Sequence, residues 1–209
     1  MDARIYKGGF GVGSVTASAG TAFTAVIPPG GPREKARITK LIYTAGNTAH
    51  SVNILKCQHK TVTTAAANAS QADIVLDDLT SVDQANGVLT TETLAASDWL
   101  VIKHSDGTFG AYSVSSVSGS TVTLSSNLVK SVDANATVYK MYELARPASG
   151  KGFPAQVLVP PASATTSIGS ENPHAAVAVS RFGEPLLIHS DNSSHAGTLV
   201  LVQGVYSSV

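Results

Sequence analysis

The stretch 98–142 constrains the fold more than any other part of this 209-residue chain, because it reads as consecutive β-strands joined by tight turns. Trp99–Lys103 is a nearly continuous apolar run, and Ser105-Asp106-Gly107 separates it from an aromatic-bearing segment at 108–114. Asp-Gly between two such runs is typical of a β-hairpin, since type I′ turns need positive φ angles, which Gly and Asp tolerate. Ser118-Gly119-Ser120 predicts a second turn of this kind. The sequence therefore predicts an all-β fold.

Further strand candidates lie on both sides of this stretch, with polar or Pro/Gly-rich turns between them. They are 21–27, 37–45, 51–57, 155–159, 175–179, 185–188 and 198–205. Only Gly46-Asn47-Thr48 separates 37–45 from 51–57, so these two segments are expected to form a hairpin. The Ala- and Thr-rich segment 61–72 is the one place where a short helix is expected.

The order of these segments predicts three regions. Residues 21–60 together with 150–209 are expected to form a β-sandwich. Residues 73–144 are expected to form a small β-barrel-like unit inserted between two of its strands. Residues 1–20 are rich in Gly, Ala and Ser and predict an extended or flexible arm. A single continuous sandwich is the alternative.

Charge is scarce and balanced in this chain. Fourteen Lys and Arg face fourteen Asp and Glu, and charged residues make up 13% of the sequence, roughly half the usual share. A chain without net charge has little colloidal repulsion, which favours a protein that packs against other subunits. No basic surplus exists to displace phosphate counterions, which argues against nucleic-acid binding.

The compartment follows from similar observations. A single cysteine, Cys57, excludes an internal disulfide framework and a cysteine-rich zinc site. The first residues lack the pattern of a signal peptide, and no apolar run approaches the roughly 20 residues that span a bilayer. We therefore expect a protein that is made in a cytoplasm, with no membrane partner.

Histidines and glycines provide the first candidate sites. The glycine-rich run at 8–13 lacks the following helix and the Lys-Ser/Thr pair of a phosphate-binding loop. His189, Asp191 and His195 could hold a divalent metal, but a solvated loop is the favoured interpretation. The remaining four histidines are interpreted as strand ends or isolated side chains: His50, His59, His104 and His174.

Acidic and aromatic residues provide the others. Asp77 and Asp78, with Asp73 and Asp83 nearby, lack the spacing of a calcium loop and are interpreted as a solvated turn. No serine stands in the strained elbow that hydrolases use. Trp99 opens an apolar strand, which favours a core position over a sugar-binding platform. The sequence thus predicts no catalytic, cofactor-binding or metal-ligating residue.

A family resemblance adds to this interpretation. The segment DWLVIKHSDGTFGAYSVSSVSGSTVTLSSNLVKSVDANATVYKMYEL resembles the small β-barrel-like modules of virion proteins from tailed bacteriophages. The segment EPLLIHSDNSSHAGTLVLVQGVY is similar to the closing strands of a sandwich in phage structural proteins, including head decoration (cement) proteins.

This resemblance implies a non-enzymatic virion protein with a jelly-roll-like sandwich that decorates and stabilises a capsid by bridging neighbouring subunits. It implies the major capsid protein and sister copies in a homotrimer as partners, on the capsid surface of a virion assembled in the host cytoplasm. Residues 1–20 are then expected to become ordered on contact with the capsid or a sister subunit. The alternatives are a tail, baseplate or head-fibre component and a carbohydrate- or cell-surface-binding β-module.

Overall fold

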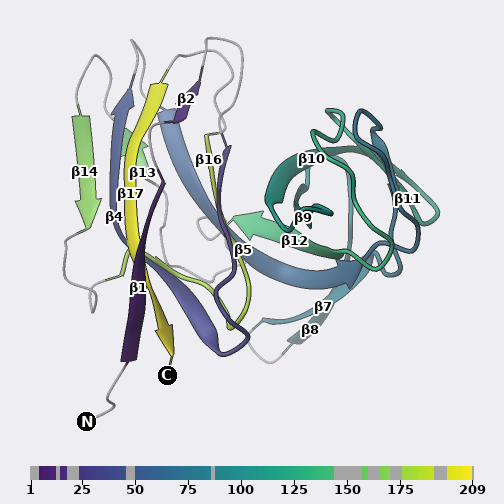
Figure 1. Cartoon of the computed structure of the whole chain (residues 1–209), viewed down its shortest axis with the longest axis horizontal. Coiled ribbons are helices and arrows are strands. Elements are labelled where there is room, and N and C mark those ends of the chain that lie inside the picture. The colour runs from purple at the N-terminus through teal and green to yellow at the C-terminus, as the bar shows by residue number, and fades with distance from the viewer. Residues whose placement is uncertain are drawn as a thin grey trace. The chain divides into compact units, whose positions relative to one another are not determined.

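A computed structural model describes residues 5–12, 15–17, 24–45, 50–85, 88–143, 157–159, 165–169, 176–190 and 197–208. Every regular element in these residues is a β-strand (Figure 1), so the all-β prediction is confirmed. Within the same residues, no helix has the length and apolarity needed to cross a bilayer. The chain divides into two compact units: unit 1 comprises residues 1–56 and 143–209, and unit 2 comprises residues 57–142.

Unit 1 is a sandwich of two antiparallel layers (Figure 1). One layer has the order β1-β17-β4-β14, with β15 paired to β4 and β2 paired to β17. In the other, β16 lies between β3 and β5, and β13 pairs with β5. The strands are β1 (Ile5–Val12), β2 (Val15–Ala17), β3 (Thr24–Ile27), β4 (Glu34–Ala45), β5 (His50–Val62), β13 (Val157–Val159), β14 (Thr165–Gly169), β15 (Ala178–Val179), β16 (Leu186–Ser190) and β17 (Gly197–Ser208).

The core of unit 1 explains its central strand. Leu186, Leu187 and Ile188 are consecutive in β16, and all three are fully buried. Such an uninterrupted apolar run can be buried only where a strand has neighbours on both edges and cover on both faces. Strands β3 and β5 supply the two edges, with Ile188 opposite Ala25 on one side and Ile54 on the other.

Residues 1–20, expected to form an extended or flexible arm, include two strands. β1 pairs antiparallel with β17 from Ile5 opposite Ser208 to Val12 opposite Val202, and β2 pairs with the other end of β17. Strands in a sheet are joined by backbone hydrogen bonds, which need no alternation of apolar and polar side chains. A glycine-rich segment can therefore form a strand that the periodicity of its sequence does not predict. The predicted domain ranges, 21–60 with 150–209 and 73–144, stay predictions.

The expected hairpin between 37–45 and 51–57 is wrong. β4 pairs with β17, β14 and β15 in one layer, whereas β5 pairs with β16 and β13 in the other. Both strands carry apolar side chains that need cover from a facing layer. Placing the two strands in opposite layers lets Ile38 and Leu41 of β4 and Ile54 of β5 all become buried.

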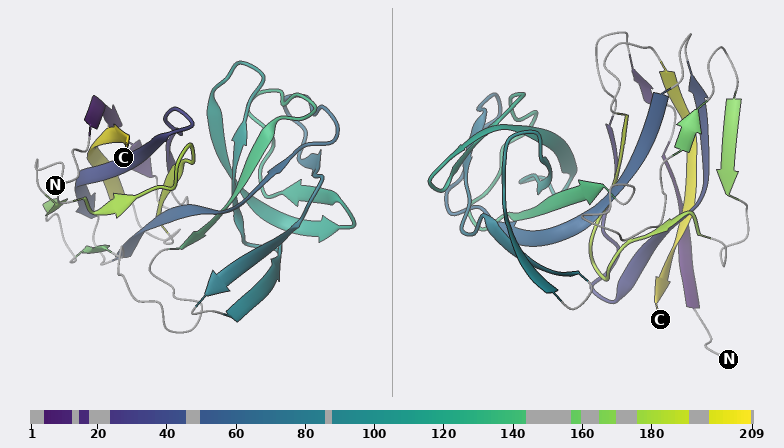
Figure 2. Two further views of the ribbon diagram at one scale, coloured as in Figure 1. Left: turned by 90° about the horizontal axis from the view of Figure 1, so that it is seen from below. Right: turned by 180° about the vertical axis from the view of Figure 1, so that it is seen from behind.

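Unit 2 is a curled sheet that closes on itself. Its strand order is β5-β12-β9-β10-β11-β6, and the isolated bridge between Thr63 and Leu76 joins the end of β6 back to the end of β5. Figure 2 shows the resulting barrel-like turn of the ribbon from two more directions. The strands are β6 (Asp73–Val75), β7 (Thr80–Ala85), β8 (Val88–Thr93), β9 (Trp99–Lys103), β10 (Phe109–Ser118), β11 (Thr121–Leu124) and β12 (Thr137–Glu143), with β7 and β8 forming a separate hairpin.

The two predicted turns join strands as expected. β9 and β10 pair from Phe109 opposite Lys103 to Ser113 opposite Trp99. Their connection is a three-residue loop in which only Gly107 has positive φ (83°), so it is not the two-residue type I′ turn that Asp-Gly predicted. Between β10 and β11, Gly119 (φ 57°) takes the first of two loop positions, which type II′ turns reserve for glycine.

The short helix considered at 61–72 is absent, and the backbone of that segment bonds to other segments of the barrel instead. Its backbone groups bond to distant partners: the Ala67 amide donates to the Val132 carbonyl at 2.9 Å, and the Val132 amide returns a bond at 2.8 Å. Partners in other segments thus outweigh the weak helix propensity of an Ala/Thr-rich sequence. Buried residues from every part of the barrel fill its interior, among them Ile74, Leu100, Val122, Leu128 and Val138.

Candidate functional site

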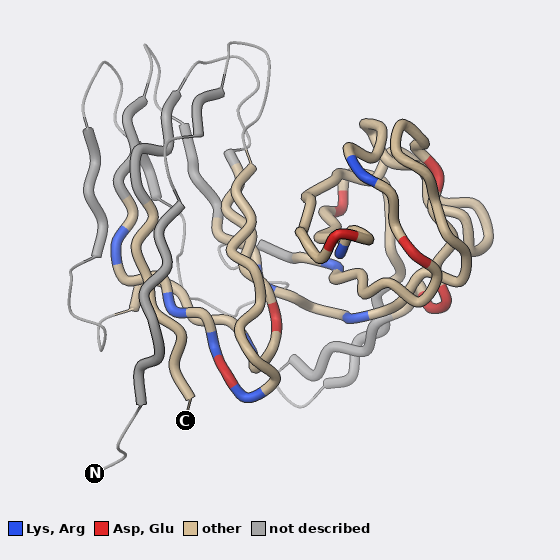
Figure 3. The backbone as a smooth tube through the Cα atoms, viewed as in Figure 1, with Lys and Arg blue, Asp and Glu red and all other residues tan. Residues whose placement is uncertain are grey.

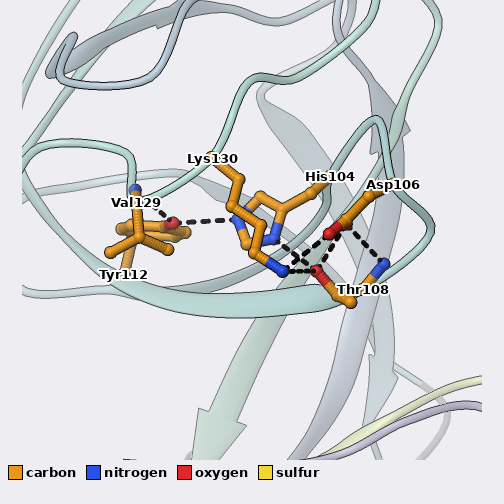
Figure 4. A network of polar contacts seen from close by, with 6 residues as sticks. All are labelled: His104, Asp106, Thr108, Tyr112, Val129 and Lys130. Carbon is orange, nitrogen blue, oxygen red and sulfur yellow. Dashed lines mark hydrogen bonds and ion pairs between the residues drawn. The ribbon is translucent and has the colours of Figure 1, made fainter.

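A network of polar side chains joins the β9–β10 hairpin to the connection between β11 and β12, residues 125–136 (Figure 4). Its members come from three places along the chain. His104, Asp106 and Thr108 lie in the connection between β9 and β10, Tyr112 lies in β10, and Lys130 lies in the β11–β12 connection.

The outer part of the network is an ion pair with a shared hydroxyl. Lys130 Nζ lies 2.6 Å from Asp106 Oδ2 and donates to Thr108 Oγ1 at 3.2 Å. The Thr108 hydroxyl and amide both donate to Asp106 Oδ1, at 2.6 and 3.0 Å. The bonds from Lys130 and Thr108 hold the pKa of the exposed Asp106 carboxyl well below its ordinary value.

The inner part of the network is a buried histidine with both ring nitrogens bonded. His104 Nδ1 lies 3.1 Å from Thr108 Oγ1, and Nε2 lies 2.9 Å from the Tyr112 hydroxyl. The Thr108 hydroxyl has already donated its single proton to Asp106, so it accepts from His104 Nδ1–H. Nε2 is therefore the acceptor of the Tyr112 proton, and the Tyr112 oxygen accepts from the Val129 amide at 3.1 Å.

Burial decides the protonation state of this histidine. His104 is 3% exposed. Desolvation lowers the pKa of the imidazole, with a smaller lowering from Lys130, and together they outweigh the opposing attraction of Asp106. Desolvation likewise raises the pKa of the Tyr112 hydroxyl above its ordinary value. The neutral forms of both side chains are thus the ones that the structure stabilises.

The packing around His104 leaves no room beside it. A Cβ atom at Gly110 would lie 2.7 Å from His104 Cε1 and 2.7 Å from Tyr112 Cε2. Both contacts are far shorter than carbon atoms tolerate. Glycine at position 110 is therefore what allows the imidazole and the phenol to meet.

The arrangement is suited to bracing rather than to proton transfer. A general base needs a free nitrogen within reach of a substrate, and both nitrogens of His104 are bonded inside the fold. A second set of bonds reinforces the same connection: Thr63 Oγ1 donates to the Asp133 carbonyl at 2.6 Å, and Ser105 Oγ donates to Asp133 Oδ1 at 2.6 Å. The prediction of no catalytic, cofactor-binding or metal-ligating residue stays a prediction.

A small depression on unit 2 gathers three further titratable groups. His59 Nε2 lies 3.6 Å from Asp78 Oδ2, and the nearly buried Lys140 Nζ lies 3.3 Å from Asp98 Oδ2. His59, Asp78 and Lys140 line the depression together with leucines from four positions. Its volume of ≈ 10 Å³ is about the room of one water molecule, too small for an organic substrate.

Apart from His104, the predicted histidine and glycine candidates that the structure describes lie in strands. His189 is a buried residue of strand β16 rather than part of a loop, and Asp191, His195 and His174 lie outside the described residues. His50 and His59 are nine residues apart on β5. The described glycines of the run at 8–13, residues 8, 9 and 11, lie within strand β1.

Two of the acidic candidates, Asp73 and Asp78, contact neighbouring side chains. The Asp73 carboxyl accepts a bond from Thr123 Oγ1 at 2.7 Å across the β6–β11 pair, and Asp78 faces His59. The side chain of Asp83 lies outside the described part. In that part, no group of three His, Cys, Asp or Glu side chains could hold a metal ion. Trp99 is half-buried at the start of β9.

Sequence reasoning passed over Thr108, Tyr112 and Lys130. A signal for the first was present, because Asp-Gly-Thr is the pattern in which an aspartate accepts bonds from the backbone two residues on. No local signal connects Lys130 with Asp106, which lie 24 residues apart.

Comparisons with known proteins give little. No protein-family model and no curated protein matches the sequence. A solved structure of VP17, a capsid protein of bacteriophage P23-77, aligns over 98% of this chain and 99% of its own, with 10% identity and a TM-score of 0.24. A complex of the two major capsid proteins of that phage, VP16 and VP17, aligns over 95% and 99%, with 12% identity and a TM-score of 0.21.

Proposed function

We propose that this chain is a non-enzymatic structural protein of a phage virion. It decorates the capsid surface and stabilises the shell by bridging neighbouring subunits of the major capsid protein, and it does so as a homotrimer. The resemblance of 98–144 and 184–206 to virion modules supports this proposal. The all-β construction from a sandwich and a closed barrel-like sheet agrees with it.

The observation that carries the proposal is that the reactive side chains form hydrogen bonds and ion pairs within the fold. His104, Thr108 and Tyr112 bond to one another and to backbone, and Lys140 is paired with Asp98. An enzyme would present such groups together in an open cleft. In the described part of this chain they instead hold strands and loops in place, which is what a component of a shell under internal pressure requires.

A sugar-binding role receives no comparable support. Such a site presents aromatic rings on an open face. Tyr112 and Tyr139 are buried, and Trp99 is half-buried. Among the described residues, the exposed large apolar side chains are Val129 and Phe182, which belong to different units.

The physical basis of capsid stabilisation is the large number of contacts that many bound copies make at once. One interface of about 1,000 Å² supplies modest affinity, but a protein that contacts two or more capsid subunits at once gains from effective concentration. Shell disruption must then break many such contacts together. A protein of this kind needs rigid surfaces and no chemistry.

The proposal is tested on capsids assembled without this protein from the major capsid protein of its phage. Purified chain is added, and copies per particle and the temperature of shell disruption are measured. We expect saturable binding at a fixed stoichiometry and a higher disruption temperature. Absence of binding, or binding that leaves the disruption temperature unchanged, would contradict the proposal.

A further inference from the structure

The chain's zero net charge is the sum of two opposite charges. Unit 1 contains ten Lys and Arg against six Asp and Glu, a net charge of +4. Unit 2 contains four Lys and Arg against eight Asp and Glu, a net charge of −4. Each unit is therefore the electrostatic complement of the other unit in a second copy of the chain.

Three cations of unit 1 lie together at one described surface, with Glu34 and Glu184 close to them in the sequence. Arg33, Lys35 and Arg181, together with Phe182, form what we call the basic turn surface. Figure 3 shows the run of alternating charges at the turn between β3 and β4. Arg33 and Arg181 are exposed, and neither guanidinium has an ion-pair partner in the described part of the chain.

Two turns hold this surface in one conformation. The Gly183 amide donates to the Glu34 carbonyl at 2.9 Å, and the Ser180 amide donates to the Ala36 carbonyl at 2.9 Å. The Glu34 carboxylate accepts from the Gly31 amide at 2.9 Å, so it is engaged inside its own turn. Gly183 has φ of 63° and packs against Pro32, where a Cβ would lie 3.3 Å from Pro32 Cα.

The surface also presents an apolar anchor. Phe182 is 45% exposed, and Lys35 Nζ lies 4.3 Å from the centre of its ring. An exposed aromatic ring among arginines is the composition found at the energetic centres of protein interfaces. Because the turns are braced through their backbone, little loop freedom would be lost on binding.

Unit 2 offers the matching carboxylates. Asp73 and Asp77 are exposed at β6 and just beyond it, and neither has an ion-pair partner in the described residues. By contrast, Asp98, Asp106 and Asp78 face a cation or a histidine of their own unit. A nucleic-acid partner fits less well, because the chain as a whole has no basic surplus.

We propose that copies of this chain associate through a heterologous contact, in which the basic turn surface of one copy binds the Asp73 and Asp77 carboxylates in unit 2 of the next. Three such contacts can close a ring, since heterologous interfaces form rings when the rotation closes. The inference deepens the proposed homotrimer but does not depend on the capsid role.

The experiment measures solution mass by light scattering and the association constant by sedimentation, across protein concentration and salt. Raising the salt from about 0.05 M to about 0.5 M shortens the screening length from over 10 Å to a few Å, and we expect association to weaken at least about tenfold. R33E/R181E and D73K/D77K should each weaken association of the pure variant to a similar degree. Mixing the two variants in equal amounts should restore it, because each mixed contact regains opposite charges.

R33K/R181K is the matched control, because it keeps both charges and should associate nearly as the native chain does. Circular dichroism and thermal unfolding establish that every variant is folded, and the salt dependence of the native chain needs no variant at all. A monomer at every concentration, association that ignores salt, or a mass increase only when DNA is added would overturn the inference. Association that follows the predicted pattern while capsids remain unbound would contradict the proposed function alone.

Discussion

His104 Nε2 lies 2.9 Å from the Tyr112 hydroxyl, with the two rings nearly perpendicular at 80° and their centres 6.0 Å apart. This contact links the end of β9 to β10, and the bond from the Val129 amide to the same hydroxyl extends the link to the β11–β12 connection. The Tyr112 oxygen accepts from Val129 and donates to His104. If Nε2 were protonated, it would donate to the same oxygen, and the Tyr112 proton would lose its acceptor.

This geometry predicts that unit 2 loses stability as the pH falls below about 6.5, the ordinary pKa of histidine. Folding lowers the pKa of His104, so below 6.5 the unfolded chain binds more protons than the folded chain. The contribution is fully present above 6.5 and is lost as the pH falls toward the lowered pKa. The urea midpoint, followed by the fluorescence of the single tryptophan, Trp99, measures it.

The comparison that isolates His104 is H104Q, which keeps hydrogen-bonding groups but does not titrate. Between pH 7 and 5, the midpoint of the native chain should fall more steeply than that of H104Q. Equal slopes would show that other groups account for the acid sensitivity.

A second prediction concerns Gly110. Replacing it with alanine places a methyl group 2.7 Å from both His104 and Tyr112, so one of these buried rings must move. We expect G110A to lower the free energy of unfolding by about 1–3 kcal/mol, the usual range for overpacking. The exposed Ser116 of the same strand supplies the control, because S116A should change stability by less than about 0.5 kcal/mol. If G110A were as stable as S116A, the two rings would have enough space to accommodate the added methyl group.

Local sequence signals predicted the strands of 98–142 well, because turn chemistry and apolar runs act over a few residues. The β9–β10 pairing and the strand order β9-β10-β11 follow from Asp106-Gly107 and Gly119. Closure of the barrel did not follow, because it depends on one bridge between Thr63 and Leu76 and on backbone bonds of an Ala/Thr-rich segment. Such bonds leave no pattern in the side chains.

The site was harder to predict than the fold for a related reason. His104 looked isolated, since its partners Thr108 and Tyr112 carry no sequence signal that links them to it and Lys130 lies far along the chain. The distribution of charge between the two units was also hard to predict from the sequence. The balance of fourteen against fourteen indicated a chain without net charge, but the division into units separates it into a positive unit and a negative unit.

A third prediction contrasts two apolar side chains of unit 2. Leu100 is 1% exposed in the barrel core, whereas Val129 is 72% exposed. L100A should lower the free energy of unfolding by about 2–5 kcal/mol, because it removes buried methyl groups and leaves a cavity. V129A should change it by less than about 0.5 kcal/mol. A large loss for V129A would show that this side chain is buried in an assembly present in solution.

The last prediction tests the closure of the barrel through Thr63, which is fully buried. Its hydroxyl donates to the Asp133 carbonyl at 2.6 Å and accepts from the Ala136 amide at 3.0 Å. T63V keeps the shape of the side chain but removes both bonds, leaving the Ala136 amide only its longer 3.3 Å contact with the Asp133 carbonyl. We expect T63V to lower the free energy of unfolding of unit 2 by about 1–2 kcal/mol, because buried polar groups lose their partners.

T63S keeps the hydroxyl and loses one methyl group, so it should cost about 1 kcal/mol or less. If urea unfolding followed by Trp99 gave T63S the larger loss, methyl packing rather than the two hydrogen bonds would be what holds the barrel closed at this point.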